Sequence, residues 1–169
     1  MLFCFILSAK FIHINVIAVW VQTQNKEIKT CVACCVSGQP SLVFSTSKDI
    51  RLLNVSKPTK VSLLVKDLDD GGAVDFYHAG QLVCWTEHGR GVIACNPINR
   101  SDQGHARVVT SAVTSPDGLA CDWVTQKLYW TDSKMNRIEV VSLNGQHRKV
   151  LVWENIDKPR AIALAPMDG

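Results

Sequence analysis

The sequence has no excess of charge of one sign. Its 18 basic and 15 acidic side chains are spread along the chain, and the formal net charge at pH 7 is only +3. Nucleic-acid-binding surfaces need a concentrated basic stripe that neutralises phosphates. Short basic groups such as 147–149 are more typical of solvated strand faces. The charge distribution therefore argues against a nucleic-acid partner.

The sequence also lacks the residue groupings that metal sites and covalent catalysis require. Segment 31–35 holds three cysteines at the spacing of half a zinc site, but a structural zinc needs four ligands and no second such pair exists. Ser115, Asp117 and His105 lie close in sequence, yet Ser-Pro-Asp is typical of a turn rather than of a nucleophile and its base. We expect no metal, no cofactor and no enzymatic activity.

The N-terminal segment lacks a basic stretch before its apolar residues. Residues 1–21 are mostly apolar but are interrupted by Lys10, His13 and Asn15. An export signal, an uncleaved anchor and an incorrectly assigned first exon all remain open for such a segment. We expect residues 1–36, with their cysteines, to form a leader or disordered segment, and residues 37–169 to form the folded part.

Seven cysteines are an odd number, so at least one thiol has no partner within the chain. Cys84 and Cys95 flank a turn, and they lie directly opposite each other in a hairpin if Glu87 faces Val92. A cross-strand disulfide and two small buried thiols are both compatible with that position. Cys121 lies in a dense apolar run and is expected to be a buried free thiol.

What the sequence does contain is an internal repeat. Residues 127–132 read KLYWTD and residues 82–87 read LVCWTE, which places Trp85 and Trp130 45 residues apart. Each copy is preceded by one short apolar run and followed by two more. Alternation of Arg137 and Glu139 with Ile138 predicts one strand face toward the core and one toward water. Four-stranded repeats of this period are typical of β-propeller blades.

The strands expected from these runs lie at 41–44, 49–53 and 60–65, then in two four-strand repeats between 73 and 153, and finally at 160–165. The predicted fold is therefore all-β, a partial six-bladed propeller with about three blades' worth of four-stranded antiparallel sheets. A complete six-bladed ring at this period needs roughly 250 residues. We interpret the sequence as a fragment of such a ring.

The repeated motif has a physical rationale. Large flat rings can fill the space between blades, and the polar residues after them can bond to backbone groups where the strand ends. The motif residues are Trp85, Thr86, Glu87, Tyr129, Trp130, Thr131 and Asp132. Because Cys84 and Glu87 depart from the fuller copy, the blade that contains them is expected to pack less tightly.

Two sequons, at Asn54 and Asn99, match the acceptor pattern for N-glycosylation. Such modification implies passage through the secretory pathway. Asn99 is the better candidate of the two, because it falls in a loop between strands.

Several strings together carry a resemblance to a known family: SPDGLACDW at 115–123, KLYWTDS at 127–133, NRIEV at 136–140 and KPRAIAL at 158–164. They resemble the first YWTD propeller of the Wnt co-receptor branch of the LDL-receptor-related proteins, over about 42–168. The resemblance implies an extracellular, membrane-attached parent protein whose propeller binds secreted Wnt ligands and protein antagonists beside a Frizzled-type receptor. Some of those antagonists present a loop that contains an Asn.

The resemblance also suggests ligand-binding residues. Arg160 and Asp69 match an arginine and an acidic position on the ligand-binding face of the family, whereas Lys134 replaces an acidic residue and Ser47 replaces a basic one. A solvated surface arginine is the alternative for Arg160. For the whole chain, the alternatives are a propeller fragment of another YWTD protein, such as a lipoprotein receptor or a nidogen-like protein, and a truncated product without function.

Overall fold

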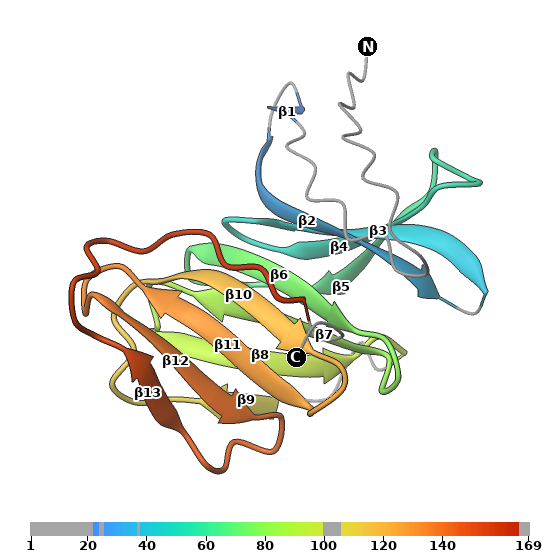
Figure 1. Ribbon diagram of the computed structural model, residues 1–169. Coiled ribbons are helices and arrows are strands. Elements are labelled where there is room, and N and C mark those ends of the chain that lie inside the picture. The colour runs from blue at the N-terminus through green and yellow to red at the C-terminus, as the bar shows by residue number, and fades with distance from the viewer. Residues whose placement is uncertain (1–21, 24–25, 37, 100–105, 166–169) are drawn as a thin grey trace.

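The computed structural model describes residues 22–23, 26–36, 38–99 and 106–165, and the regular elements in these ranges are all β-strands (Figure 1). The expected all-β class, with about three blades' worth of antiparallel sheets, is confirmed. Within these ranges we find no helix long and apolar enough to span a membrane.

The strands form three sheets, each a meander of antiparallel neighbours. The first sheet contains β1 (Gln22–Thr23), β2 (Lys26–Val36), β3 (Gln39–Thr46), β4 (Ile50–Asn54) and β5 (Val61–Val65). The second contains β6 (Gly71–Tyr77), β7 (Leu82–Glu87), β8 (Val92–Pro97) and β9 (Ala106–Val109). The third contains β10 (Pro116–Asp122), β11 (Lys127–Asp132), β12 (Arg137–Ser142) and β13 (Lys149–Val152).

The second and third sheets repeat the same hairpin geometry 45 residues apart. Gln81 and Gln126 occupy the same turn position in the two sheets and have φ values of 49° and 57°. The Asn-Gly pair after β12 also behaves as its sequence predicts, because Gly145 has a φ of 80°. The repeat seen in the sequence is thus a repeat of backbone geometry.

Two expected boundaries differ from the structure. The expected folded part begins at residue 37, but the structure places β2 in the first sheet, where it pairs with β3 and buries Ile28, Cys31 and Val32. Because the consecutive residues Cys31 and Val32 are both buried, this strand is covered on both faces there, although it carries no copy of the motif. In contrast, 160–165 is not a strand, because only isolated contacts tie it to β10 and β11 and no backbone ladder forms.

Two apolar clusters lie between the sheets. One is centred on Trp85 and joins the first sheet to the second, and the other is centred on Trp130 and joins the second to the third. Both indole rings are fully buried. Looser packing of the blade that contains Trp85 stays a prediction, because burial does not measure packing density. The half-buried Tyr129 lies outside both clusters.

The cysteines settle the alternatives left open by the sequence. Cys84 and Cys95 are paired across β7 and β8, with Glu87 opposite Val92, and form a disulfide. Cys121 is a buried free thiol, and burial, together with the charges of Asp75 and Asp122, raises its pKa to about 12. A thiol with so high a pKa is a poor nucleophile at neutral pH.

Polar side chains also bridge neighbouring sheets. The Ser45 hydroxyl in β3 donates to the Gly72 carbonyl at the start of β6, at 2.6 Å. Asp75 in β6 accepts the Cys121 backbone N–H of β10 at 2.7 Å. Burial raises the pKa of Asp75, and its bonds from the N–H groups of Cys121 and Phe76 offset only part of that effect.

Asp122 fixes the turn that follows β10, and it supplies a testable pH dependence. Its carboxylate accepts the N–H groups of Val124 and Thr125 and the Thr125 hydroxyl. Burial acts to raise the pKa of Asp122, but these bonds and the charge of Lys127 outweigh it, so the pKa is lowered. A lowered carboxyl pKa contributes stability that is present above the unfolded-state value, near 3.9, and is lost as the pH falls through the folded-state value.

We therefore expect Asp122→Asn to cost about 1 kcal/mol at pH 7, since Asn retains one acceptor oxygen but no charge. The cost should shrink as the pH falls from about 4. Urea midpoints of both proteins between about pH 3 and pH 7 measure this difference. Asp157→Asn, at an exposed position, is the control, and a cost that did not change with pH would contradict the assignment.

Candidate functional site

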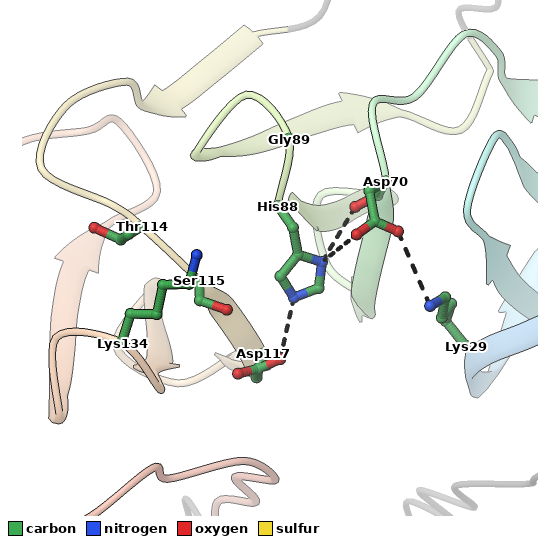
Figure 2. A pocket seen from close by; sticks show the side chains of 8 residues that line it. All are labelled: Lys29, Asp70, His88, Gly89, Thr114, Ser115, Asp117 and Lys134. Carbon is green, nitrogen blue, oxygen red and sulfur yellow. Dashed lines mark hydrogen bonds and ion pairs between the residues drawn. The ribbon is translucent and has the colours of Figure 1, made fainter.

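The candidate site lies where the strands of all three sheets end on one side of the molecule. An open hollow of about 430 Å³ is present there (Figure 2). Its lining comes from β2, from the turns after β7 and β11, and from the chain leading into β6 and β10. The lining residues are Lys29, Asp70, His88, Gly89, Thr114, Ser115, Asp117 and Lys134.

Asp132 holds two walls of this hollow in place. Its carboxylate, with no exposed area, accepts the N–H groups of Thr114 and Ser115 at 2.7 and 3.1 Å. It also accepts the N–H groups of Lys134 and Met135 in the turn after β11, at 3.2 and 3.0 Å. The last residue of the motif therefore ties the approach to β10 to the β11–β12 turn.

Glu87 takes the equivalent position in the second sheet and is 2% exposed. It accepts the Asp69 N–H at 3.0 Å and forms an ion pair with Arg90 at 2.6 Å. The Glu87 side chain is one methylene longer than that of Asp132, and its Oε1 accepts a hydrogen bond from the Trp85 indole nitrogen at 3.2 Å. The indole nitrogen of Trp130, beside the shorter Asp132, has no hydrogen-bond partner among the described residues.

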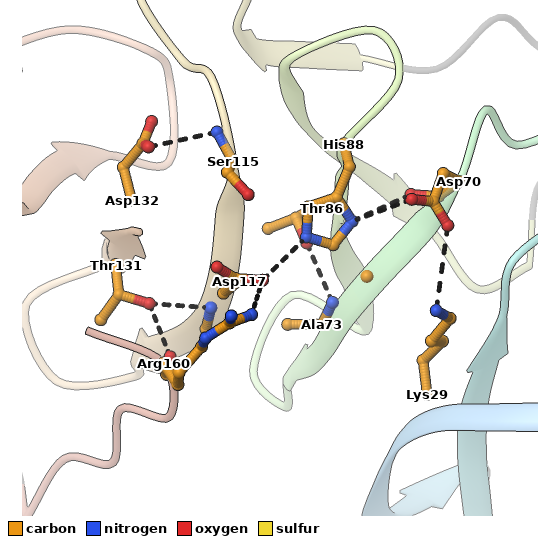
Figure 3. A network of polar contacts seen from close by, with 12 residues as sticks. Lys29, Asp70, Ala73, Thr86, His88, Ser115, Asp117, Thr131, Asp132 and Arg160 are labelled. Atoms are coloured by element: carbon orange, nitrogen blue, oxygen red, sulfur yellow. Dashed lines mark hydrogen bonds and ion pairs between the residues drawn. The ribbon is translucent and has the colours of Figure 1, made fainter. Parts of the chain in front are cut away.

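Acidic side chains alternate with lysine, histidine and arginine side chains across the hollow (Figure 3). The Lys29 ammonium lies 3.9 Å from the Asp70 carboxylate, and the His88 ring lies between Asp70 and Asp117. His88 Nε2 is 3.1 Å from Asp117 Oδ1, and the Arg160 guanidinium approaches the same oxygen at 3.2 Å. This chain of polar contacts connects all three sheets.

The second oxygen of Asp117 lacks a hydrogen-bond donor among the residues that the structure describes. Asp117 Oδ2 is buried and has no hydrogen-bond partner within the described ranges. A buried carboxylate oxygen without a donor is costly, and a ligand that supplies an N–H or O–H removes that cost. The Lys134 ammonium has no ion-pair partner among the described residues. The lining of the hollow therefore includes a carboxylate with one unpaired oxygen and an unpaired ammonium group.

Arg160 is positioned through its backbone rather than through a strand. The Thr131 hydroxyl accepts the Gly118 N–H at 2.9 Å and donates to the Arg160 carbonyl at 2.6 Å. Gly118 is required at this crossing, because a Cβ atom would collide with the Arg160 carbonyl oxygen. In the second sheet, the Thr86 hydroxyl accepts the Ala73 N–H at 2.9 Å in the same way.

The three ligand-binding residues suggested by the sequence have different positions relative to the hollow. Lys134 lines the hollow, and Arg160 lies beside it on Asp117 with 70% of its side chain exposed. Asp69 is exposed but does not line the hollow; its neighbour Asp70 does. The Asp69 carbonyl accepts the Gly89 N–H, so this residue supports the β7–β8 turn.

Sequence reasoning missed Lys29, Asp70, His88 and Asp117 as members of one site. The sequence predicts Asp117 only as part of a turn and Lys29 as part of the leader. Alignment of the two repeats could have found Asp70, because Asp70 and Ser115 are 45 residues apart, as are Gly89 and Lys134, and all four line the hollow. Nothing in the sequence signals that β2 reaches this site.

The predicted glycosylation positions lie away from the hollow. Asn54 ends β4, and Asn99 is exposed in the turn after β8. Both strands begin at the end of their sheet that carries the hollow and run away from it. The residue after Asn99 lies outside the described ranges.

Comparison with known proteins supports the interpretation of the repeated motif. Residues 126–164 match the low-density lipoprotein receptor repeat class B. The chain is 44% identical over 140 residues to low-density lipoprotein receptor-related protein 5 of Mus musculus, and 45% identical over 134 residues to that of Homo sapiens. These alignments cover 82% and 79% of the chain but only 9% and 8% of the two relatives.

Solved structures show the same fold. A chain of a nidogen/laminin complex matches with a TM-score of 0.71 at 24% identity, covering 76% of this chain and 50% of that one. An auxiliary nutrient binding protein from Bacteroides thetaiotaomicron matches with a TM-score of 0.62 at 13% identity, covering 75% of this chain and 31% of that one. The expectation that the chain is not an enzyme agrees with its receptor-type relatives.

Proposed function

Because this chain corresponds to part of a YWTD β-propeller of the LDL-receptor-related type, we propose that it binds a secreted protein ligand of the Wnt pathway through the hollow that Asp117 and Lys134 line. The proposed setting is the extracellular side of the plasma membrane, beside a Frizzled-type receptor. The observation that carries the proposal is a polar hollow built from all three sheets and lined by Asp117, whose buried Oδ2 has no hydrogen-bond partner among the described residues.

The chemistry of the hollow favours a ligand loop with an amide side chain. The NH₂ group of an Asn can donate to Asp117 Oδ2, and its carbonyl oxygen can accept from Lys134 or from the exposed guanidinium of Arg160. A carboxylate in the same place would meet Asp117 without a proton to share. The loop of a Wnt antagonist that presents an Asn has the required groups.

We expect Arg160→Ala to weaken binding about tenfold, since arginine is one of the residue types enriched among the largest contributors to binding energy once a ligand buries them. Surface plasmon resonance of the whole chain against a secreted Wnt protein measures the change. Lys149→Ala, which removes an exposed cation on β13, is the control and should leave affinity unchanged. Unaltered affinity in Arg160→Ala would remove this residue from the site.

Competition by a short loop peptide tests the amide contact. A peptide with a central Asn should compete with the protein ligand, and its Asn→Asp form should compete more weakly because two carboxylates would then face each other. Asp117→Asn should reduce that difference, because the charge repulsion disappears. Equal competition by both peptides against the unsubstituted chain would contradict the proposal.

A further inference from the structure

The turn between β4 and β5 has a geometry that suits enzymatic modification. The six residues after Asn54 are all exposed. The Asn54 side-chain oxygen accepts the Ser56 N–H at 2.9 Å, and the Asn54 carbonyl accepts the Lys57 N–H at 3.0 Å. This compact turn holds the Asn54 amide beside the exposed Ser56, and its Nδ2 has no hydrogen-bond partner within the described part.

The turn lies at the far end of the first sheet from the hollow. The β3–β4 turn is at the hollow's end, since the carbonyls of Ser47 and Lys48 accept the N–H groups of Gly71 and Leu68, which lead into β6. β4 then runs away from that end for five residues, a distance of about 15 Å. Figure 1 shows the β4–β5 hairpin on the side opposite the start of β6.

We propose that Asn54 is an N-glycosylation site and that its glycan occupies the face opposite the ligand-binding hollow. The donor is a lipid-pyrophosphate-linked oligosaccharide. Nδ2 bonds to C1 of the first sugar as the bond from C1 to the pyrophosphate oxygen breaks; Nδ2 loses a proton and the lipid pyrophosphate leaves with the bonding electrons. The proposal rests on the extracellular location given under the proposed function.

The position gives the glycan a defined effect. A branched sugar at the β4–β5 turn covers the start of β5, which is the edge strand of its sheet. The hollow on the other side stays uncovered. The glycan therefore restricts which face of the sheet array a large partner can approach, without contact to the ligand.

The third sheet contains a matched internal control. Asn144, in the turn after β12, also accepts the N–H of the residue two positions on, at 3.0 Å. That residue is Gln146, so the turn lacks the hydroxyl of a sequon. Asn144 is also followed by Gly145, and Asn-Gly pairs are prone to spontaneous deamidation. Conversion of Asn144 to Asp therefore measures how much conversion occurs without a glycan.

The test is to secrete the whole chain from insect cells behind a heterologous signal and to release its glycans with a peptide N-glycosidase in heavy-oxygen water. Peptide mass spectrometry should show the heavy-oxygen label at Asn54 well above that at Asn144. Ser56→Ala should abolish the label at Asn54, and because Ser56 is exposed the fold should be retained. Label at Asn54 no greater than at Asn144 would overturn the proposal.

A second measurement separates this proposal from the proposed function. Ser56→Ala should change affinity for the Wnt probe by less than twofold, because the glycan lies away from the hollow. A larger loss would overturn the assignment of the glycan to the opposite face. If the chain binds no Wnt protein, the proposed function fails, but the label at Asn54 still decides the modification.

Discussion

Trp130→Ala is expected to lower the free energy of unfolding by about 3–5 kcal/mol, the usual cost of removing a fully buried indole. The ring has no exposed area and lies in the cluster between the second and third sheets. The Arg148 guanidinium stacks over it, with 5.1 Å between the guanidinium carbon and the ring centroid. Because typical domains are stable by only about 5–15 kcal/mol, this loss approaches the total.

Chemical denaturation of the secreted chain measures this effect, and Trp153 supplies the control. Trp153 is 61% exposed at the end of the third sheet, so Trp153→Ala should change stability by no more than about 0.5 kcal/mol. A loss below about 1 kcal/mol for Trp130→Ala would contradict the role of this ring as the main packing element between the sheets.

Asp132→Ala is expected to cost about 3–4 kcal/mol and to abolish ligand binding. The substitution leaves four backbone N–H groups without their acceptor, and hydrogen bonds to a charged group are the stronger kind. Thr114, Ser115 and Lys134, three of those donors, also line the hollow. Stability and binding should therefore fall together.

Hydrogen exchange distinguishes this local role from general destabilisation. In Asp132→Ala, the amides of Thr114, Ser115, Lys134 and Met135 should exchange faster than those of β3 and β4 in the first sheet. Asp132→Asn should give an intermediate loss, because Asn keeps the shape and one acceptor oxygen. Uniform acceleration across all three sheets would show that Asp132 does not hold these turns specifically.

The hairpins of the second and third sheets could be predicted closely. β7 and β11 coincide with residues 82–87 and 127–132, because strict local patterning and turn residues decide where such strands begin and end. The opposition of Cys84 and Cys95 also follows from the length of the turn between them. These features depend on neighbours within one hairpin.

The environment of Glu139 could not be predicted. The alternation of charged and apolar residues in β12 predicts that Glu139 faces water, but the residue is only 2% exposed. Its carboxylate lies between the guanidinium groups of Arg137 and Arg148, with N···O distances of 2.7 and 2.8 Å. Arg148 comes from the next strand and stacks on Trp130 at the same time. A buried charge of this kind requires partners that only packing brings together.

The sequence by itself determined the type of fold and the repeat, because the period of apolar residues, the turn residues and the tryptophan motif all act over short distances along the chain. Only the tertiary structure decided the site. Lys29, His88, Asp117 and Arg160 come from four separate segments, and their interactions depend on how the sheets stack. β2 joins the first sheet through a local hairpin with β3, but only the stacking of the sheets brings Lys29 on this strand beside Asp70, since contacts between distant segments leave no local pattern.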